Sequence, residues 1–411
     1  MRKFVLKKEK IILLIFTIAF FLLFLNDHTI YSVFFDNYTS ILTVIAALLF
    51  IIGIFLVGKI YSNVKFWISI VLWLICVTIS CVLYGVNRMY YVRIVYWFVV
   101  IFSITSIYLC GIDFKKIFYN VAKIFLIWAL VNYCINLYGI EKLPITDTAS
   151  ELLYKWYDVN LYQFFFSKCF SHLTIGGMSF LRLDRPFGEP GIAQMYFNFA
   201  ILYILFCSNE KKSKKNFWLV LFSAGSLLSF SLTGYIIYLF LFLVYFYKKK
   251  RYSLVFIMSF ISFIIVLLMF TAKTETFSYS DRSADLRLML NTIMTNLPFG
   301  IGLGNANSID RAMFNELGDL SVGFYCGLLY PLSEYGLFGL LYYFILLYSI
   351  FHFSREKEAC VAFAIYILIT LFTEPQADEP FIVAFLISGL VLYSEEKKYN
   401  FDIPKLTIGE E

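Results

Sequence analysis

Long apolar runs recur along the whole chain, and they limit the folds open to it more than any other feature. Of the 411 residues, 61% are hydrophobic and only 15% are charged, which lies well outside the range of soluble domains. A run of about 20 apolar residues is long enough to cross the hydrocarbon core of a bilayer as a helix. In that core the backbone polar groups of a segment must be satisfied internally, which favours helices. The sequence therefore predicts an all-α integral membrane protein, with a single polytopic domain over residues 1–411.

The apolar runs predict about twelve transmembrane helices. They are expected at 11–25, 41–58, 66–84, 92–110, 117–138, 191–207, 217–230, 232–247, 253–271, 330–352, 359–373 and 380–394. The first run follows a basic start and resembles a signal peptide, but Asn26 and the residues after it do not form a small-residue cleavage site. We therefore expect this run to be retained as the first helix.

Basic residues set the expected orientation of the helices. With both termini cytoplasmic, 22 of the 34 lysines and arginines fall in cytoplasmic segments, as the positive-inside rule requires. The basic clusters 211–215 and 248–251 are both cytoplasmic only if two short helices cross the membrane between them. Two long connections, 139–190 and 272–329, then become extracytoplasmic loops. We expect the functional residues to lie in or beside these two loops.

Each long loop contains one segment of distinctive pattern. In the first loop, apolar and aromatic residues between Leu152 and Phe166 lie among charged residues such as Lys155 and Asp158, which favours either a helix lying in the membrane interface or a lid packed on other loops. In the second loop, the stretch from Asp281 to Ile293 predicts an amphipathic helix that ends before Pro298. Ser280 or Asp281 is expected to be its N-cap.

Arg182 and Arg185 lie in the segment 182–191, directly before the sixth predicted helix. Arginines beside spanning helices commonly extend into lipid headgroups, and that is one interpretation of this pair. The other is a binding site, because prolines stiffen the segment and glycines allow close approach. A guanidinium presents a planar fork that binds phosphate oxygens bidentately. Two arginines in one outer loop therefore indicate a site for a phosphate-bearing ligand.

Two glutamates near helix ends are candidate catalytic residues. Glu189 comes immediately before Pro190 and the sixth helix, where a carboxylate either caps the helix or accepts a proton from a substrate. Glu334 lies early in the tenth helix, and a carboxylate within a membrane segment is a functional candidate by default.

Arg282 and Arg287 on the predicted loop helix also have two interpretations. Both can pair with Asp281 and Asp285 on the same helix. Exposed pairs of this kind contribute only about 0.5 kcal/mol, so stability alone is a weak reason for them, and substrate binding is the alternative. The glycine-rich turn at 300–305 lacks the lysine and hydroxyl of a P-loop, so ATP is not an expected substrate.

Residue types that bind metals are sparse. His28, His172 and His352 are scattered and form no cluster with cysteines, so no metal site and no cofactor are expected. The acidic turn from Glu374 to Glu379 offers oxygen ligands for a divalent cation, although a solvated turn is the simpler interpretation. The net charge of +6 is explained by the basic loops between helices, so nucleic acid is not an expected partner.

Four motifs in a fixed order resemble a known family. They are RPFGEPG at 185–191, SFSLTG at 229–234, LPFGIGLGN at 297–305 and LSEYGLFG at 332–339. This order in a chain of about twelve helices resembles the O-antigen polymerase and O-antigen ligase superfamily, bacterial membrane enzymes that handle glycans linked to undecaprenyl pyrophosphate. The resemblance covers roughly residues 182–345, while the first five helices match only in hydropathy.

The resemblance implies roles for individual residues. Arg182 or Arg185, and Arg282 or Arg287, correspond to arginines of the family that engage the substrate pyrophosphate. Ligases of the superfamily carry a histidine in the stretch that corresponds to 322–331, and this chain has none there. A polymerase of Wzy type is therefore implied rather than a ligase.

The implied protein is a metal-independent, inverting glycosyltransferase of the bacterial cytoplasmic (inner) membrane. It would join lipid-linked oligosaccharide repeat units into a surface polysaccharide, such as O-antigen, capsule or exopolysaccharide. Its partners would be the polyprenyl-pyrophosphate-linked donor and acceptor, membrane lipids, and chain-length regulator and flippase proteins. A ligase-like glycan transferase and a flippase or transporter remain alternatives, although a transporter is expected to show two repeat-related halves, and the sequence has no visible internal repeat.

Overall fold

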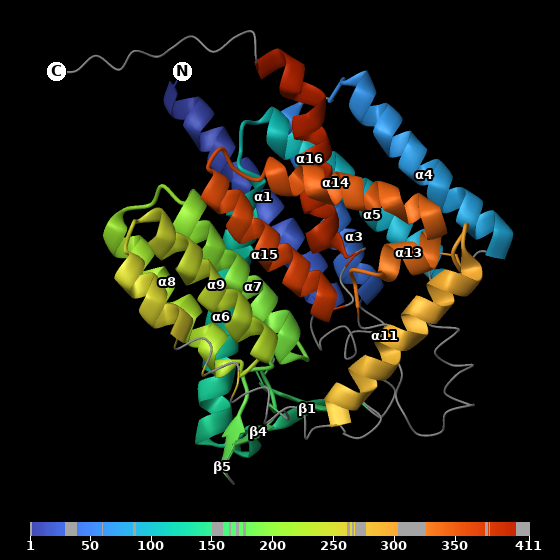
Figure 1. The fold of residues 1–411 in the computed structure, drawn as a ribbon. Helices are drawn as coiled ribbons and strands as arrows, with labels where there is room; N and C mark the ends of the chain where they lie inside the picture. The colour runs from blue at the N-terminus through green and yellow to red at the C-terminus, as the bar shows by residue number, and fades with distance from the viewer. Residues whose placement is uncertain are drawn as a thin grey trace.

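The protein is described by a computed structural model at residues 2–28, 39–59, 61–84, 88–149, 159–163, 166–169, 172–175, 178–260, 264, 267, 277–302, 326–374, 377 and 379–399. Most of the described chain is helical, and the helices form one bundle (Figure 1). We call the end of the bundle where α6 (Phe114–Tyr138) ends and α7 (Pro190–Leu202) begins the loop end. The opposite end, where α8 (Lys212–Leu228) begins, is called the basic end.

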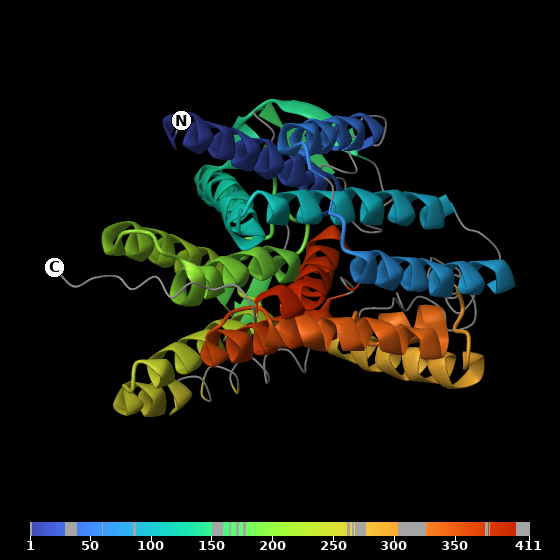
Figure 2. The same cartoon turned by 90° about the horizontal axis from the view of Figure 1, so that it is seen from above.

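The first five predicted helices are all present. They are α1 (Arg2–His28), α3 (Thr39–Val57), α4 (Val64–Tyr84), α5 (Arg88–Leu109) and α6. α6 has clear end signals: the Asp113 side chain accepts from Lys115 N–H at its start, and Gly139 at φ 106° ends it. α1 packs against α3 and α6, which places the N-terminal helices at one side of the bundle (Figure 2).

α7 lies in the interior of the bundle and packs against α6, α8, α9 (Leu232–Lys248) and α15 (Lys357–Thr373). Pro190 occupies its first turn, where the missing N–H costs nothing. Its last part widens into a π-helix at Tyr203–Cys207. The predicted helix 253–271 is helical at 252–260, Ile264 and Leu267, and its other residues lie outside the described chain.

The tenth predicted helix is broken, so the expectation of one continuous helix over 330–352 is wrong. α13 (Tyr330–Tyr335) is followed by a 3-10 turn at Gly336–Gly339 and then by α14 (Leu340–Phe351). Gly336 has φ 57°, and the N–H of Leu337 donates to Pro298 O at 2.8 Å instead of to its own helix. The break thus arises from a contact with a segment over thirty residues earlier. α16 (Pro380–Tyr399) completes the bundle and packs against α14 and α5.

The first long loop contains two small antiparallel sheets, which hydropathy did not predict. β1 (Ile145–Ala149), β2 (Val159–Tyr162) and β3 (Phe166–Ser167) form one, and β4 (His172–Ile175) and β5 (Met178–Leu181) form the other. The described part of the predicted interfacial helix, from Val159 onward, is therefore strand. Residues 150–158 of that prediction lie outside the described chain.

The predicted helix of the second long loop is confirmed as α11 (Phe277–Asn296), which ends before Pro298. It begins before Asp281, so Ser280 and Asp281 lie inside the helix and the predicted N-cap is wrong. α11 packs against α13, on the side of the bundle opposite α1 and α3 (Figure 2). Residues 303–325 lie outside the described chain.

Aromatic rings fill the centre of the bundle. Phe118 of α6 lies 5.4 Å from Phe24 of α1, 5.2 Å from Phe381 of α16 and 6.3 Å from Phe199 of α7, between ring centroids. Such tilted, edge-on and offset-stacked pairs add attraction beyond their burial of apolar area. The cluster joins the first, middle and last parts of the chain in one core.

Three helical segments of the described chain are long and apolar enough to cross a membrane: Phe114–Tyr138, Pro190–Cys207 and Tyr330–Phe351. Shorter apolar helices accompany them, among them Leu232–Lys248 and Pro380–Leu392. Large apolar side chains lie on the outside of the bundle, for example Phe55 at 79% exposure, as expected for a surface in contact with lipid. The fold fits a membrane protein, while twelve crossings and their direction stay predictions.

Candidate functional site

The arginine segment, residues 182–191, lies at the loop end and contacts the hairpin between α8 and α9. Arg182 Nε donates to the carbonyl of Ser229 at 3.1 Å, and Leu183 N–H donates to the carbonyl of Leu228 at 2.8 Å. Arg182 is half-buried, so part of its side chain is accessible. The arginine segment, which contains the first of the four motifs, thus donates hydrogen bonds to backbone carbonyls in and beside the second motif.

Arg185 is buried and holds the arginine segment together. It is only 2% exposed, and its Nη1 donates to Gly188 O at 2.9 Å while its Nε donates to Lys168 O at 3.1 Å. Asp184, which is fully buried, places a carboxylate oxygen 3.8 Å from Nη1. A buried charge is stable only when it is paired and hydrogen-bonded. These partners give Arg185 a structural role at the base of the site.

Two asparagines of α6 fix the segment that Arg185 reaches. Asn132 accepts from Ser167 N–H at 3.0 Å and donates to Ser167 O at 3.1 Å. One turn later, Asn136 accepts from Cys169 N–H at 2.8 Å and also donates to Ser167 O at 3.0 Å. Side chains four residues apart lie on one face of a helix. The two side-chain amides therefore bind the backbone N–H and C=O groups of the loop together, as the backbone of a neighbouring strand would.

Polar side chains of α7 continue this contact into the bundle. Asn198 Nδ2 donates to Gln194 Oε1 at 2.8 Å and to Gly234 O at 3.0 Å, and Asn198 Oδ1 accepts from Ser226 Oγ at 3.2 Å. A Cβ at Gly234 would lie 2.8 Å from Gln194 Cβ, so only glycine permits this approach. The hairpin motif at 229–234 is therefore required by packing against α7.

The third and fourth motifs also contact each other. Ile301 N–H donates to Ser333 O at 2.9 Å, and Gly302 N–H donates to Glu334 O at 3.0 Å. A Cβ at Gly300 would lie 2.5 Å from the carbonyl carbon of Glu334, and one at Gly336 would lie 2.6 Å from Gly300 N. The two glycines let the backbones touch, and this contact produces the break between α13 and α14.

Glu334, predicted as a catalytic residue, is fully buried beneath this glycine loop. The backbone carbonyl of Glu334 accepts a hydrogen bond from Gly302 N–H. Glu334 belongs to α13, which begins at Tyr330. The burial confirms that this carboxylate is not part of the polar surface. Its catalytic role stays a prediction.

Glu374 contacts both the first motif and the segment just before α13, although little in its local sequence singles it out. It follows the last residue of α15, is 3% exposed, and its carboxylate lies against Gly191, where a Cβ would be 2.7 Å from Glu374 Cδ. Its carbonyl accepts from Gly327 N–H at 3.2 Å, just before α13. The interpretation of Glu374 as part of a solvated turn is therefore wrong. An acidic residue between a helix and a proline was the only available signal.

The other predicted site residues lie at the start of α7 and on α11. Glu189 is exposed, and although it is the N-cap residue of α7, its side chain makes no capping hydrogen bond. Arg287 is exposed on α11. Arg282 lies on the same helix, but its side chain is outside the described residues. Arg185 thus lies in the first motif, whereas Arg287 lies on α11, the helix that leads into the third motif.

The electrostatics of the loop end are set by short-range pairs. Lys168 Nζ lies 2.7 Å from Glu141 Oε1, and this hydrogen bond lowers the pKa of Glu141 and raises the pKa of Lys168. Burial, followed by the charge of Asp184, raises the pKa of the Cys169 thiol. At neutral pH the Glu141–Lys168 pair is charged, whereas Cys169 is a neutral thiol and a poor nucleophile.

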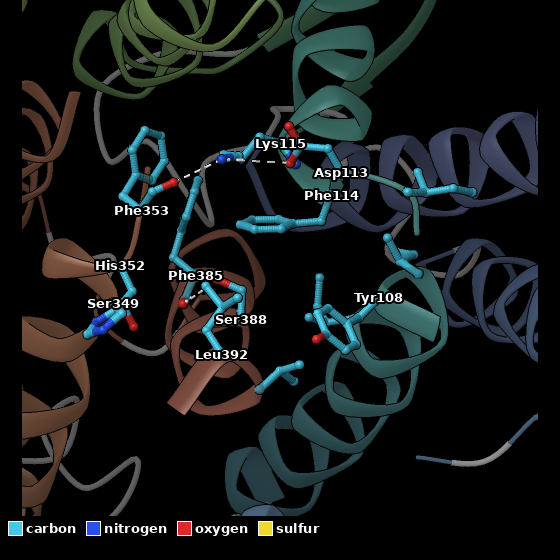
Figure 3. Close-up of a pocket in the computed structure, with 14 residues that line it drawn as sticks. Tyr108, Asp113, Phe114, Lys115, Ser349, His352, Phe353, Phe385, Ser388 and Leu392 are labelled. Carbon is cyan, nitrogen blue, oxygen red and sulfur yellow. Dashed lines mark hydrogen bonds and ion pairs between the residues drawn. The ribbon is translucent and has the colours of Figure 1, made fainter. Parts of the chain in front are cut away.

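A pocket also lies at the basic end (Figure 3). It has a volume of about 150 Å³, and its lining combines apolar residues of α5 and α16 with polar ones such as Asp113, Lys115 and His352. Lys115 Nζ donates to Phe353 O at 2.9 Å across it (Figure 3). The 25 residues of α6 separate this pocket from the loop end, a distance of about 37 Å at 1.5 Å per residue. It therefore belongs to a different part of the molecule.

Among the described residues, no three His, Cys, Asp or Glu side chains gather as a metal site would require. The polar groups described at the loop end include arginines, carboxylates and backbone amides. Comparisons of the chain with known protein families, with curated proteins and with solved structures find no match.

Proposed function

We propose that the protein is a polymerase that joins polyprenyl-pyrophosphate-linked oligosaccharide repeat units on the outer face of the bacterial cytoplasmic membrane. One observation carries the proposal. The segments that contain the four motifs behind the family resemblance lie far apart in the sequence, yet they contact each other in pairs, and Glu374 contacts both Gly191 of the first motif and Gly327 just before α13. Such contacts join polar loop segments that are far apart in the sequence, which supports a common site for a charged, sugar-bearing lipid.

The proposed roles of the arginines follow from their exposure. Arg182 and Arg287 have accessible side chains and are assigned to the pyrophosphate, with Arg282 as a further candidate on the same helix as Arg287. Arg185 already donates to two carbonyls in the interior, so we assign it to positioning the segment that carries Arg182. A positive charge that meets the leaving group stabilises the transition state more than the ground state.

The proposed reaction needs one proton acceptor. A hydroxyl of the acceptor sugar attacks the anomeric carbon of the donor, the bond between that carbon and the pyrophosphate oxygen breaks, and the lipid pyrophosphate leaves with the electron pair. Glu189 is exposed at the start of α7 and is the better placed base for the hydroxyl proton. Glu334 is fully buried, so we assign it to supporting the glycine loop.

Reconstitution in vesicles with a lipid-linked repeat unit tests the proposal. We expect wild-type protein to produce a ladder of elongated glycans, and Arg182→Ala and Arg287→Ala to reduce elongation at least about 100-fold, the loss expected for about 2.7 kcal/mol of transition-state stabilisation. Arg355→Ala is the matched control, because Arg355 is exposed near the basic end. Transfer of finished polymer to another carrier without elongation would instead identify a ligase.

A transporter is the second candidate, because the helix between α13 and α14 is broken, and broken helices form the substrate sites of many transporters. The break begins six residues after Tyr330, about 9 Å along the helix, which is nearer to the middle of the 22-residue segment Tyr330–Phe351 than to its end. Movement of the lipid-linked sugar across vesicles with no change in glycan length would favour this candidate and exclude the polymerase.

A further inference from the structure

An apolar groove runs along the part of α6 nearest the loop end. It has a volume of about 660 Å³ and is lined by Val131, Cys134 and Tyr138 of α6 and by Leu143 and Phe166 of the first long loop. Val131 is 44% exposed and Tyr138 is 84% exposed. Most of the residues that line the groove are apolar or aromatic, so the groove suits a hydrocarbon chain.

The position of the groove along α6 places it at a membrane boundary. Phe114–Tyr138 is one of the segments long and apolar enough to span a bilayer, and Tyr138 is its last residue. Val131 and Tyr138 are seven residues apart, about 10 Å along the helix axis. The groove therefore covers the last third of the span, where a chain in one leaflet approaches its headgroup.

A positive charge marks the end of the groove. Lys142 lines it, is exposed, and its Nζ donates to Tyr138 O at 3.2 Å while lying 5.3 Å from the centroid of the Tyr138 ring. These contacts hold the ammonium group of Lys142 beside this end of the groove. The neighbouring Lys168 is paired with Glu141 at 2.7 Å, so among these three described residues Lys142 leaves one net positive charge, which complements a phosphate.

Phe166, which lines the groove, is joined through the residues that follow it to the arginine segment. Phe166 directly precedes Ser167, which Asn132 binds through two hydrogen bonds. The next residue, Lys168, offers its carbonyl to Arg185 Nε at 3.1 Å. A chain in the groove would thus lie beside the backbone that supports the arginine segment.

We propose that this groove holds the isoprenoid chain of a polyprenyl-phosphate lipid, with the phosphate at Lys142. A single groove with one positive charge fits a single-chain lipid with a compact phosphate better than a phospholipid, which brings two chains. The inference rests on the proposed function, because it places the lipid part of that substrate beside the arginine segment.

The test uses a photoreactive polyprenyl monophosphate that carries no sugar, with full-length protein in nanodiscs. Crosslinks are mapped by mass spectrometry, and unlabelled polyprenyl phosphate or phosphatidylglycerol is added as competitor. We expect crosslinks within 130–143, displaced by polyprenyl phosphate at a concentration at least tenfold lower than that of phosphatidylglycerol. Val131→Trp fills the groove and Lys142→Gln removes its charge without changing the fold, and each should weaken labelling about tenfold.

Leu137→Trp is the matched control, because Leu137 is 65% exposed on the same helix but does not line the groove. Equal labelling of Val131→Trp, Lys142→Gln and Leu137→Trp, or equal competition by phosphatidylglycerol, overturns the proposal. Because the probe has no sugar, binding is read separately from polymerisation. Labelling without elongation would reject the proposed function but support the groove, and elongation without labelling would reject the groove alone.

Discussion

Replacing Gly336 with alanine tests whether the contact between the glycine loop and the helix break stabilises the fold. Gly336 has φ 57°, a conformation that side chains rarely adopt, which costs about 1–3 kcal/mol for alanine. A Cβ there would also lie 2.6 Å from Gly300 N and closer still to Pro298 O. Overpacking against backbone costs about 1–3 kcal/mol more. Gly336→Ala should therefore lower the free energy of unfolding by about 2–6 kcal/mol.

Gly111→Ala separates the two contributions. Gly111 also has a positive φ, 69°, but a Cβ there would have nothing within 4 Å. It should therefore show only the conformational cost, so that Gly336→Ala exceeds it by about 1–3 kcal/mol. Gly300→Ala perturbs the same contact from the other side, and the double variant with Gly336→Ala should cost at least about 0.5 kcal/mol less than the sum, because the first substitution already separates the backbones.

The assay is unfolding in mixed micelles by titration with a denaturing detergent, followed by circular dichroism. All four variants are measured in the same micelles, so that differences in the free energy of unfolding are compared rather than absolute values. If Gly336→Ala and Gly111→Ala differ by less than about 0.5 kcal/mol, the error expected for such comparisons, the close backbone contact is not what holds the two segments together.

Three further predictions concern pairs elsewhere in the protein. Asn132→Ala should destabilise the first long loop by about 1–3 kcal/mol, because buried backbone groups lose their partner, and limited proteolysis that leaves this loop as resistant as in wild type would contradict it. Glu210→Ala should cost about 1–3 kcal/mol, because Lys123 lies 3.5 Å away and only 13% of its side chain is exposed; adding Lys123→Met should recover part of the loss in the same unfolding assay, and no recovery would argue against the pairing. Lys168 lowers the pKa of Glu141, so the stabilisation from this pair is present above the ordinary glutamate pKa and is lost as pH falls through the lowered value. Because the pair is exposed, Glu141→Gln should differ from wild type by less than about 0.5 kcal/mol at pH 7 and not at all in strong acid; a difference that grows on acidification would have the wrong sign.

Hydropathy and end signals were sufficient to locate the helices. Each of the twelve predicted segments contains helix in the described chain, and α11 was recognised from its amphipathic pattern. These features depend on residues close together in the sequence, such as Asp113 and Gly139 at the ends of α6. The break at Gly336 and the strands of the first loop were missed, because both depend on hydrogen bonds to distant segments.

The sequence by itself determined a helical, apolar chain with arginines and glutamates concentrated near two long loops. The tertiary structure decided which of these charges are buried supports and which are accessible. Arg182 and Arg185 look alike in the sequence, yet Arg185 is buried and donates to the carbonyls of Lys168 and Gly188, whereas Arg182 is half-exposed. Glu374 became central only when α15 brought it against Gly191. The reason is physical: burial and hydrogen bonding of a charge depend on atoms supplied by other segments, and no local pattern records them.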